Sequence, residues 1–254
     1  MLSYLHHPDE AVVRANLESA QENRVLRHAM PPDTLDSRQG KFWKHHAAIA
    51  LECASAAYAL EGDAALVRDL LRDSSACFTR ALAKEGAVNL AEMQQQLALA
   101  VLLGDSARLE ALCALPRARY SSPDMVFPEA AHGAFEVFCA LATQQPDAAR
   151  SRLAEADALL AGGKLPRPVR DDIGAALALE QAILDGNASG FDDALGKRND
   201  SFAAKFSNPQ IQHHPHGLLD VWGLGLASLA RARGLKVQAD SVYTPQALLH
   251  LGDI

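Results

Sequence analysis

The feature that most constrains the fold is a helix-stop signal that recurs about every 40 residues along the chain. It reads Gly-Asp or Gly-Asn at Gly62, Gly104 and Gly186, and Pro-Asp at Pro146. Glycine adopts the left-handed conformation that ends a helix, and a following Asp or Asn side chain caps the next helix. Proline also ends a helix and suits the first position of another. The recurrence predicts a series of antiparallel helical hairpins, although Gly-Asp is also a common turn dipeptide.

Between these signals the apolar residues follow a helical period, as at Leu90, Met93, Leu97 and Val101. Alanine and leucine, both strong helix formers, are frequent throughout. Alternating apolar and polar residues are nearly absent, and the one possible extended piece is residues 235–243. We therefore predict an all-α fold of about ten helices. The hairpins would form a tetratricopeptide-like solenoid or a compact bundle, in a single domain spanning residues 1–254.

The charge balance argues against two classes of partner. The chain has 24 basic and 31 acidic residues, a formal net charge of −7. Nucleic acids and anionic membranes both require a clustered basic surface, so neither is expected to bind. The acidic surplus aids solubility and would also help to capture a basic protein. Because the chain shows neither an export signal nor an apolar run of about 20 residues, we expect a soluble, cytoplasmic protein.

The densest cluster of polar residues comprises His213, His214 and His216, with Asp220 one turn further on. Neutral imidazoles bind zinc or act as general bases. Adjacent histidines before a helix rarely converge on one metal, however, and no Glu-x-x-His spacing accompanies them. We expect them to lie at the start of a helix and to form no metal site. Zinc-ligand spacing is also absent among the cysteines, which are expected to be buried thiols: Cys53, Cys77, Cys113 and Cys139.

The sequence predicts no catalytic residue and no cofactor, since it contains neither a phosphate-binding glycine loop nor a nucleophile elbow. Two acidic pairs stand out, Asp171 with Asp172 and Asp192 with Asp193. Each lies near the start of a predicted helix, where carboxylates stabilise the helix dipole. The same four side chains are candidates for contacting a basic protein partner.

The C-terminal part of the chain carries the most distinctive pattern. A His-Pro-x-Gly helix start is followed by a helix of small residues that ends in Arg-Gly-Leu, and then by a Tyr-x-Pro tail with a Leu pair. Over about 40 residues this pattern resembles the C-terminal signature of the immunity protein 49 family of bacterial polymorphic toxin systems. The residues that carry it have a structural character: Pro215, Gly217, Leu218, Asp220, Gly234, Tyr243, Pro245 and Leu248.

The resemblance implies a protein without enzymatic activity that neutralises a toxin domain by one-to-one binding. It does not identify the toxin. Two other classes remain open. One is a tetratricopeptide-like scaffold or secretion chaperone that binds a peptide or protein. The other is a metal-dependent or acid–base enzyme that uses the histidine cluster.

Overall fold

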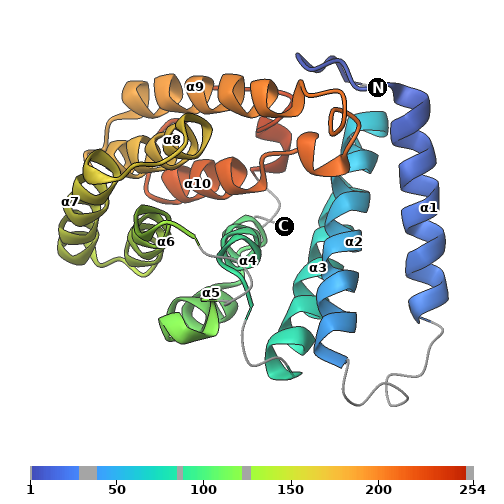
Figure 1. Ribbon diagram of the computed structural model, residues 1–254, viewed down its shortest axis with the longest axis horizontal. Helices are drawn as coiled ribbons and strands as arrows, with labels where there is room; N and C mark the ends of the chain where they lie inside the picture. The colour runs from blue at the N-terminus through green and yellow to red at the C-terminus, as the bar shows by residue number, and fades with distance from the viewer. Residues whose placement is uncertain (1, 29–38, 85–87, 122–126, 250–254) are drawn as a thin grey trace.

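The computed structural model describes residues 2–28, 39–84, 88–121 and 127–249, and these residues form an all-helical fold (Figure 1). They contain ten α-helices, three short 3-10 helices and no strand, which confirms the predicted fold class. The α-helices are α1 (Glu10–His28), α2 (Gln39–Glu61), α3 (Ala64–Lys84), α4 (Leu90–Leu102), α5 (Ser106–Cys113), α6 (Glu129–Ala142), α7 (Pro146–Gly162), α8 (Arg167–Leu184), α9 (Ala188–Phe206) and α10 (Val221–Ala232). The 3-10 helices are η2 (Arg117–Arg119), η3 (Pro215–Gly217) and η4 (Gln246–Leu248).

The predicted junctions form the turns within four consecutive helical hairpins, α2–α3, α4–α5, α6–α7 and α8–α9. Gly62, Gly104 and Gly186 all have a left-handed backbone, with φ between 65° and 68°. At the third junction the left-handed residue is Gln144, with φ of 59°, two positions before Pro146. The pyrrolidine ring fixes φ of proline at a negative value, so Pro146 occupies the first position of α7 instead.

Three of the four junctions share one hydrogen-bond pattern, whether or not glycine is present. In each, the N–H after the left-handed residue donates to a carbonyl five positions earlier, the bond that defines a Schellman motif. The third junction is therefore the same structural unit as its neighbours. The bonds are Asp105 N to Ala100 O (2.9 Å), Gln145 N to Ala140 O (2.8 Å) and Asn187 N to Ala182 O (2.9 Å).

Replacing Gln144 with glycine is expected to raise the free energy of unfolding by about 0.5–1 kcal/mol. A left-handed backbone costs an ordinary L residue roughly 1–2 kcal/mol, and part of that gain is offset by the greater entropy of glycine in the unfolded chain. Gln144 is exposed, so little packing is lost. Urea denaturation checks the change, and Gly104→Ala, where φ is 66°, is the opposite control and should destabilise by about 1 kcal/mol. A destabilised Gln144→Gly variant would contradict the argument.

The last helix closes the array of hairpins into a bundle. Helix α10 packs along α4 and also contacts α8, so it lies between the C-terminal hairpin and the centre of the molecule (Figure 1). The ring of Trp222 on α10 lies 4.5 Å from that of Phe138 on α6. One cluster of buried hydrophobic residues extends from Tyr4 to Leu249. The helices thus share a core, and the single-domain organisation of residues 1–254 stays a prediction.

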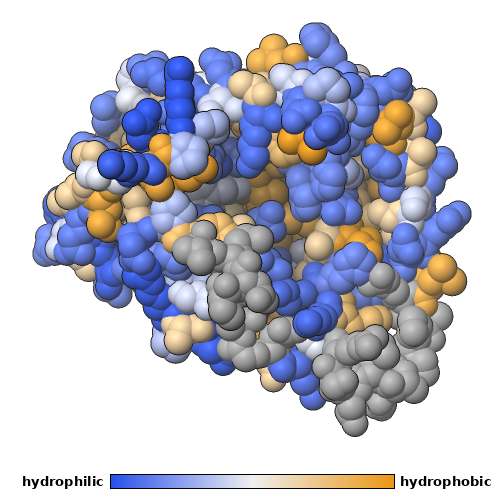
Figure 2. Space-filling view, in the orientation of Figure 1, coloured by the Kyte–Doolittle hydropathy of each residue, from blue (hydrophilic) through white to orange (hydrophobic). Residues whose placement is uncertain are grey.

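The face shown in Figure 2 is largely hydrophilic, and apolar residues gather toward the middle of the view, over the region where Figure 1 places α4 and α10. None of the described helices is both long and apolar enough to cross a bilayer.

Candidate partner-binding surface

The His-Pro-x-Gly part of the C-terminal pattern forms η3, which packs against α2 and α9. Pro215 and Gly217 are buried, and Leu218 is fully enclosed. A Cβ atom on Gly217 would lie 2.6 Å from the ring of Phe206 on α9, so no larger side chain fits there without displacing that ring. These residues fix the path of the chain into α10.

Asp220 caps α10 and also forms a buried ion pair. Its carboxylate accepts the N–H of Gly223 at 3.0 Å and binds the guanidinium of Arg198 through two nitrogens, one of them at 2.9 Å. The side chains of Arg198 and Asp220 are only 7% and 3% exposed. Burial acts to lower the pKa of Arg198, but Asp220, together with Asp172 and Glu180, raises it by more, so the guanidinium stays charged. One side chain thus joins the start of α10 to the middle of α9.

The rest of the pattern holds the C-terminal tail, residues 235–249, on the bundle. Gly234 ends α10 with φ of 85°, and residues 235–243 continue as irregular chain rather than as a strand. The hydroxyl of Tyr243 accepts the N–H of Leu5 at 3.1 Å and lies 2.9 Å from Nδ1 of His6. Pro245 and Leu248 are buried. Because nearly all of the pattern is inside the fold, its residues do not form an exposed binding surface.

The four acidic candidates are grouped differently in the structure than in the sequence: Asp171 lies with Asp193 in one groove, whereas Asp172 and Asp192 each bind another part of the chain. Asp192 accepts the N–H groups of Gln238 and Ala239, both within hydrogen-bond distance, and so holds the tail. Asp172 lies 3.3 Å from the buried guanidinium of Arg198, on the opposite side of α8 from Asp171. Asp171 and Asp193 are exposed and line one shared groove between α8 and α9.

This α8–α9 groove has a volume of about 640 Å³ and an acidic rim. Its walls are short side chains at helical spacing, so the space between the two helices stays open. Asp185 joins Asp171 and Asp193 on the rim, although the sequence indicated it only as part of a helix stop. Lys197 is the one basic side chain in the lining. Asp185 lies nearly four turns after Asp171, a spacing that could have indicated a shared face. The small lining residues are Gly174, Ala175, Ala178, Ala182, Gly190 and Ala194.

A second depression, of about 430 Å³, lies on the other side of α8 and is more apolar. Trp222 of α10 and Ile173 of α8 form part of its wall, and Val169 at its edge is 37% exposed. Its charged lining residues are Asp172, Arg198 and Lys205. The first half of α8 is therefore a ridge between an acidic groove and an apolar hollow, a combination found at protein interfaces, where aromatic anchors are flanked by charge.

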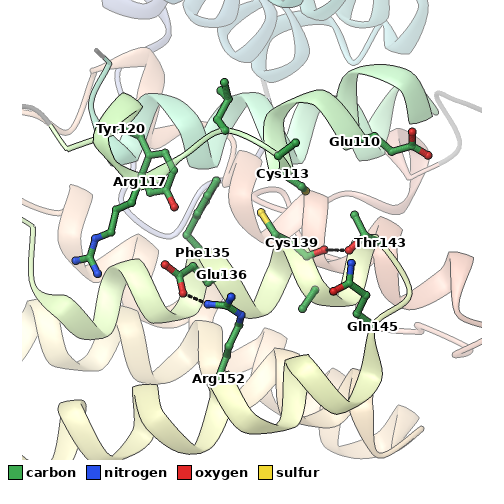
Figure 3. A pocket seen from close by; sticks show the side chains of 13 residues that line it. Glu110, Cys113, Arg117, Tyr120, Phe135, Glu136, Cys139, Thr143, Gln145 and Arg152 are labelled. Atoms are coloured by element: carbon green, nitrogen blue, oxygen red, sulfur yellow. Dashed lines mark hydrogen bonds and ion pairs between the residues drawn. The ribbon is translucent and has the colours of Figure 1, made fainter. Parts of the chain in front are cut away.

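A third cavity, of about 360 Å³, lies among α5, η2, α6 and α7 (Figure 3). Its charges are balanced, with Arg152 paired to Glu136 across it. The thiol of Cys139 points into it, and a hydrogen bond with Cys113, together with burial, raises the pKa of Cys139 well above its ordinary value. A thiol nucleophile requires the opposite shift, so this arrangement favours a neutral, unreactive thiol.

Helix α8 also contributes a buried carboxyl group, Glu180, which is fully enclosed. Neither of its oxygens has a hydrogen-bond partner in the described part of the chain. Burial raises its pKa well above 4.5, against the opposing charge of Arg198. Below about pH 4.5 the group is neutral in both folded and unfolded chains; at higher pH the unfolded chain ionises freely and the folded chain does not. Its contribution to stability therefore falls as the pH rises from 4.5 toward the folded pKa.

Glu180→Met is consequently expected to raise the free energy of unfolding by about 1–3 kcal/mol near pH 7, and by less near pH 4.5. The apolar side chain has a similar size and needs neither a proton nor a hydrogen bond. Denaturation at several pH values measures the difference in the free energy of unfolding between Glu180→Met and the original protein. Glu180→Gln is the control, because it removes the titrating group but keeps a polar one. A stability difference between the two proteins that does not change with pH would refute the assigned protonation state of Glu180.

The histidine cluster is divided in the structure. Nδ1 of His213 accepts the N–H of Asp9 at 2.9 Å, which ties it to the start of α1. The rings of His214 and His216 stack at 4.8 Å, and Nε2 of His216 lies 3.3 Å from the carboxylate of Glu52 on α2. No sequence pattern indicates Glu52, which lies far from these histidines in the chain.

Taken together, the repeated hairpins and the two grooves beside α8 define an all-helical protein with open depressions on both sides of one helix. The chain belongs to the immunity protein 49 family, whose model matches residues 38–248 and so extends well beyond the C-terminal pattern. No curated protein and no solved structure matches the chain.

Proposed function

We propose that this chain neutralises a toxin that acts in the cytoplasm, by binding the toxin domain one to one and without chemistry of its own. Membership of the immunity protein 49 family carries the proposal. A binding mechanism is supported by the exposed grooves beside α8, while Cys139, whose thiol lines the third cavity, is held in its unreactive form.

The α8 ridge is our candidate for the toxin-binding surface. The rim carboxylates Asp171, Asp185 and Asp193 would meet basic side chains of the toxin, and the neighbouring hollow with Trp222 would take an apolar anchor. The net charge of −7 favours a basic toxin, mainly by accelerating encounter and selecting the partner.

Co-expression tests the function. Cells that express the toxin gene adjacent to this one should survive only when this protein is also present, and the purified pair should form a one-to-one complex. The proposal fails if no protection occurs, or if protection requires turnover of a small molecule by this protein. Binding of a secreted protein without protection would support the alternative of a secretion chaperone.

Charge reversal tests the surface. The double variant Asp171→Lys with Asp193→Lys should slow association with the toxin about tenfold at low salt and weaken its salt dependence. The matched control reverses Asp69 and Asp147, whose side chains are 76% and 99% exposed on α3 and α7, so the net charge changes equally. Equal slowing in both variants would show that only the overall charge matters and would exclude the groove as the interface.

A further inference from the structure

We propose that Glu52, His214 and His216 form a binding site for a divalent transition-metal ion such as Zn²⁺. One potential ligand atom from each residue lies within 4.8 Å of the other two. The proposal is independent of toxin binding, and it reverses the expectation that the histidines form no metal site. That expectation depended on the absence of metal-ligand spacing in the sequence around the histidines, and the structure brings a third ligand to them from α2.

The geometry of the nearest pair matches coordination better than a simple ion pair. Nε2 of His216 and a carboxylate oxygen of Glu52 are 3.3 Å apart. Two ligands bound at about 2.0–2.1 Å and at a tetrahedral angle lie about 3.3–3.4 Å from one another. A charge-assisted hydrogen bond between the same groups would be shorter, at about 2.7–2.9 Å.

The third ligand is His214, whose ligand atom lies within 4.8 Å of the other two. Pro215 holds His214 and His216 on one side of the chain with their rings stacked. The ring of His214 is restrained by a long contact of 3.3 Å with the N–H of His216, which can be given up at little cost. A metal binds the neutral form of imidazole, which is the main form of an ordinary histidine at pH 7.

The donor set of two imidazoles and one carboxylate is a combination that zinc accepts, with a fourth position left to water. All three side chains retain some exposure, so an ion can reach them. The ligands come from α2 and from the segment that leads into α10. A bound ion would therefore link the first hairpin to the C-terminal part of the bundle and stabilise the folded chain.

The test uses untagged, chelator-treated protein titrated with zinc in a calorimeter near pH 7.5. We expect about one equivalent to bind, and saturating zinc to raise the melting temperature by roughly 5 °C. Glu52→Gln, His214→Asn and His216→Asn should each weaken binding at least tenfold. Asparagine at position 214 can still accept the N–H of residue 216, so the local turn is preserved.

His7→Asn is the matched control. His7 is an exposed histidine outside the cluster with φ of 49°, a backbone conformation that asparagine tolerates, so zinc affinity should not change. Melting of each metal-free variant verifies that it folds. The proposal is overturned if no stoichiometric binding occurs, or if binding survives all three ligand substitutions and disappears in Cys113→Ser, which would assign the ion to the thiols.

Discussion

Arg198→Met is expected to lower the free energy of unfolding by about 3–5 kcal/mol, measured as a lower urea midpoint with an unchanged m-value. Methionine fills much of the same volume, but it leaves the carboxylate of Asp220 buried without a cation. The hydrogen bond from the Gly223 N–H cannot compensate for a lost bidentate pair in an enclosed site. The loss of stability arises from the unpaired buried charge of Asp220 rather than from lost packing.

The double variant Arg198→Met with Asp220→Ser distinguishes these causes. Serine still caps α10, and no buried carboxylate remains, so the double variant should recover part of the stability lost in Arg198→Met. Losses that simply add would show that the two residues act independently and would contradict the buried-pair argument.

Gly225→Ala is expected to destabilise the protein by about 1–3 kcal/mol, because the backbone of α10 lies against Ala98 of α4 there. A Cβ atom on Gly225 would lie 2.5 Å from Cβ and 2.7 Å from Cα of Ala98. Backbone on both sides leaves no flexible group to move, so the helices must separate.

Two variants control for the general effect of adding a methyl group to a helix. Gly196→Ala on α9 meets nothing within 4 Å, so it should stabilise by about 0.5–1 kcal/mol through helix propensity. Ala98→Gly should partly rescue Gly225→Ala by removing one of the two clashing atoms. A loss in Gly196→Ala equal to that in Gly225→Ala would exclude the close contact as the cause.

The positions of the hairpin turns were predictable because helix ends are determined by a few neighbouring residues. A glycine followed by Asp or Asn satisfies the unpaired groups of two helix ends, and that requirement is visible within a few residues at Gly62, Gly104 and Gly186. The third junction was displaced to Gln144, since a Schellman turn constrains the backbone and does not demand glycine. The closure of α10 onto α4 was not predictable, because it depends on which small residues face each other across a long separation in sequence.

The candidate sites were predictable only in part, for the same reason. Asp171 and Asp193 line one groove, whereas the adjacent Asp172 and Asp192 bind Arg198 and the backbone of the C-terminal tail, although Asp172 stays 60% exposed. Whether a carboxylate meets solvent or an internal partner depends on packing between helices. Glu52 illustrates the point most clearly, since its approach to His216 follows from tertiary contacts alone.

The bond between Tyr243 and the segment around Leu5 has a consequence for the order in which the chain folds during synthesis. Residues 4–6 leave the ribosome before the hairpins, yet the Tyr243 side chain that binds them is added more than 200 residues later. The hairpins in between can assemble in turn as they emerge, but Leu5 and His6 gain their bonds to the tail only after Tyr243 has emerged. A fragment lacking residues 235–249 would therefore leave residues 4–6 more open to proteolysis than a chain that includes them.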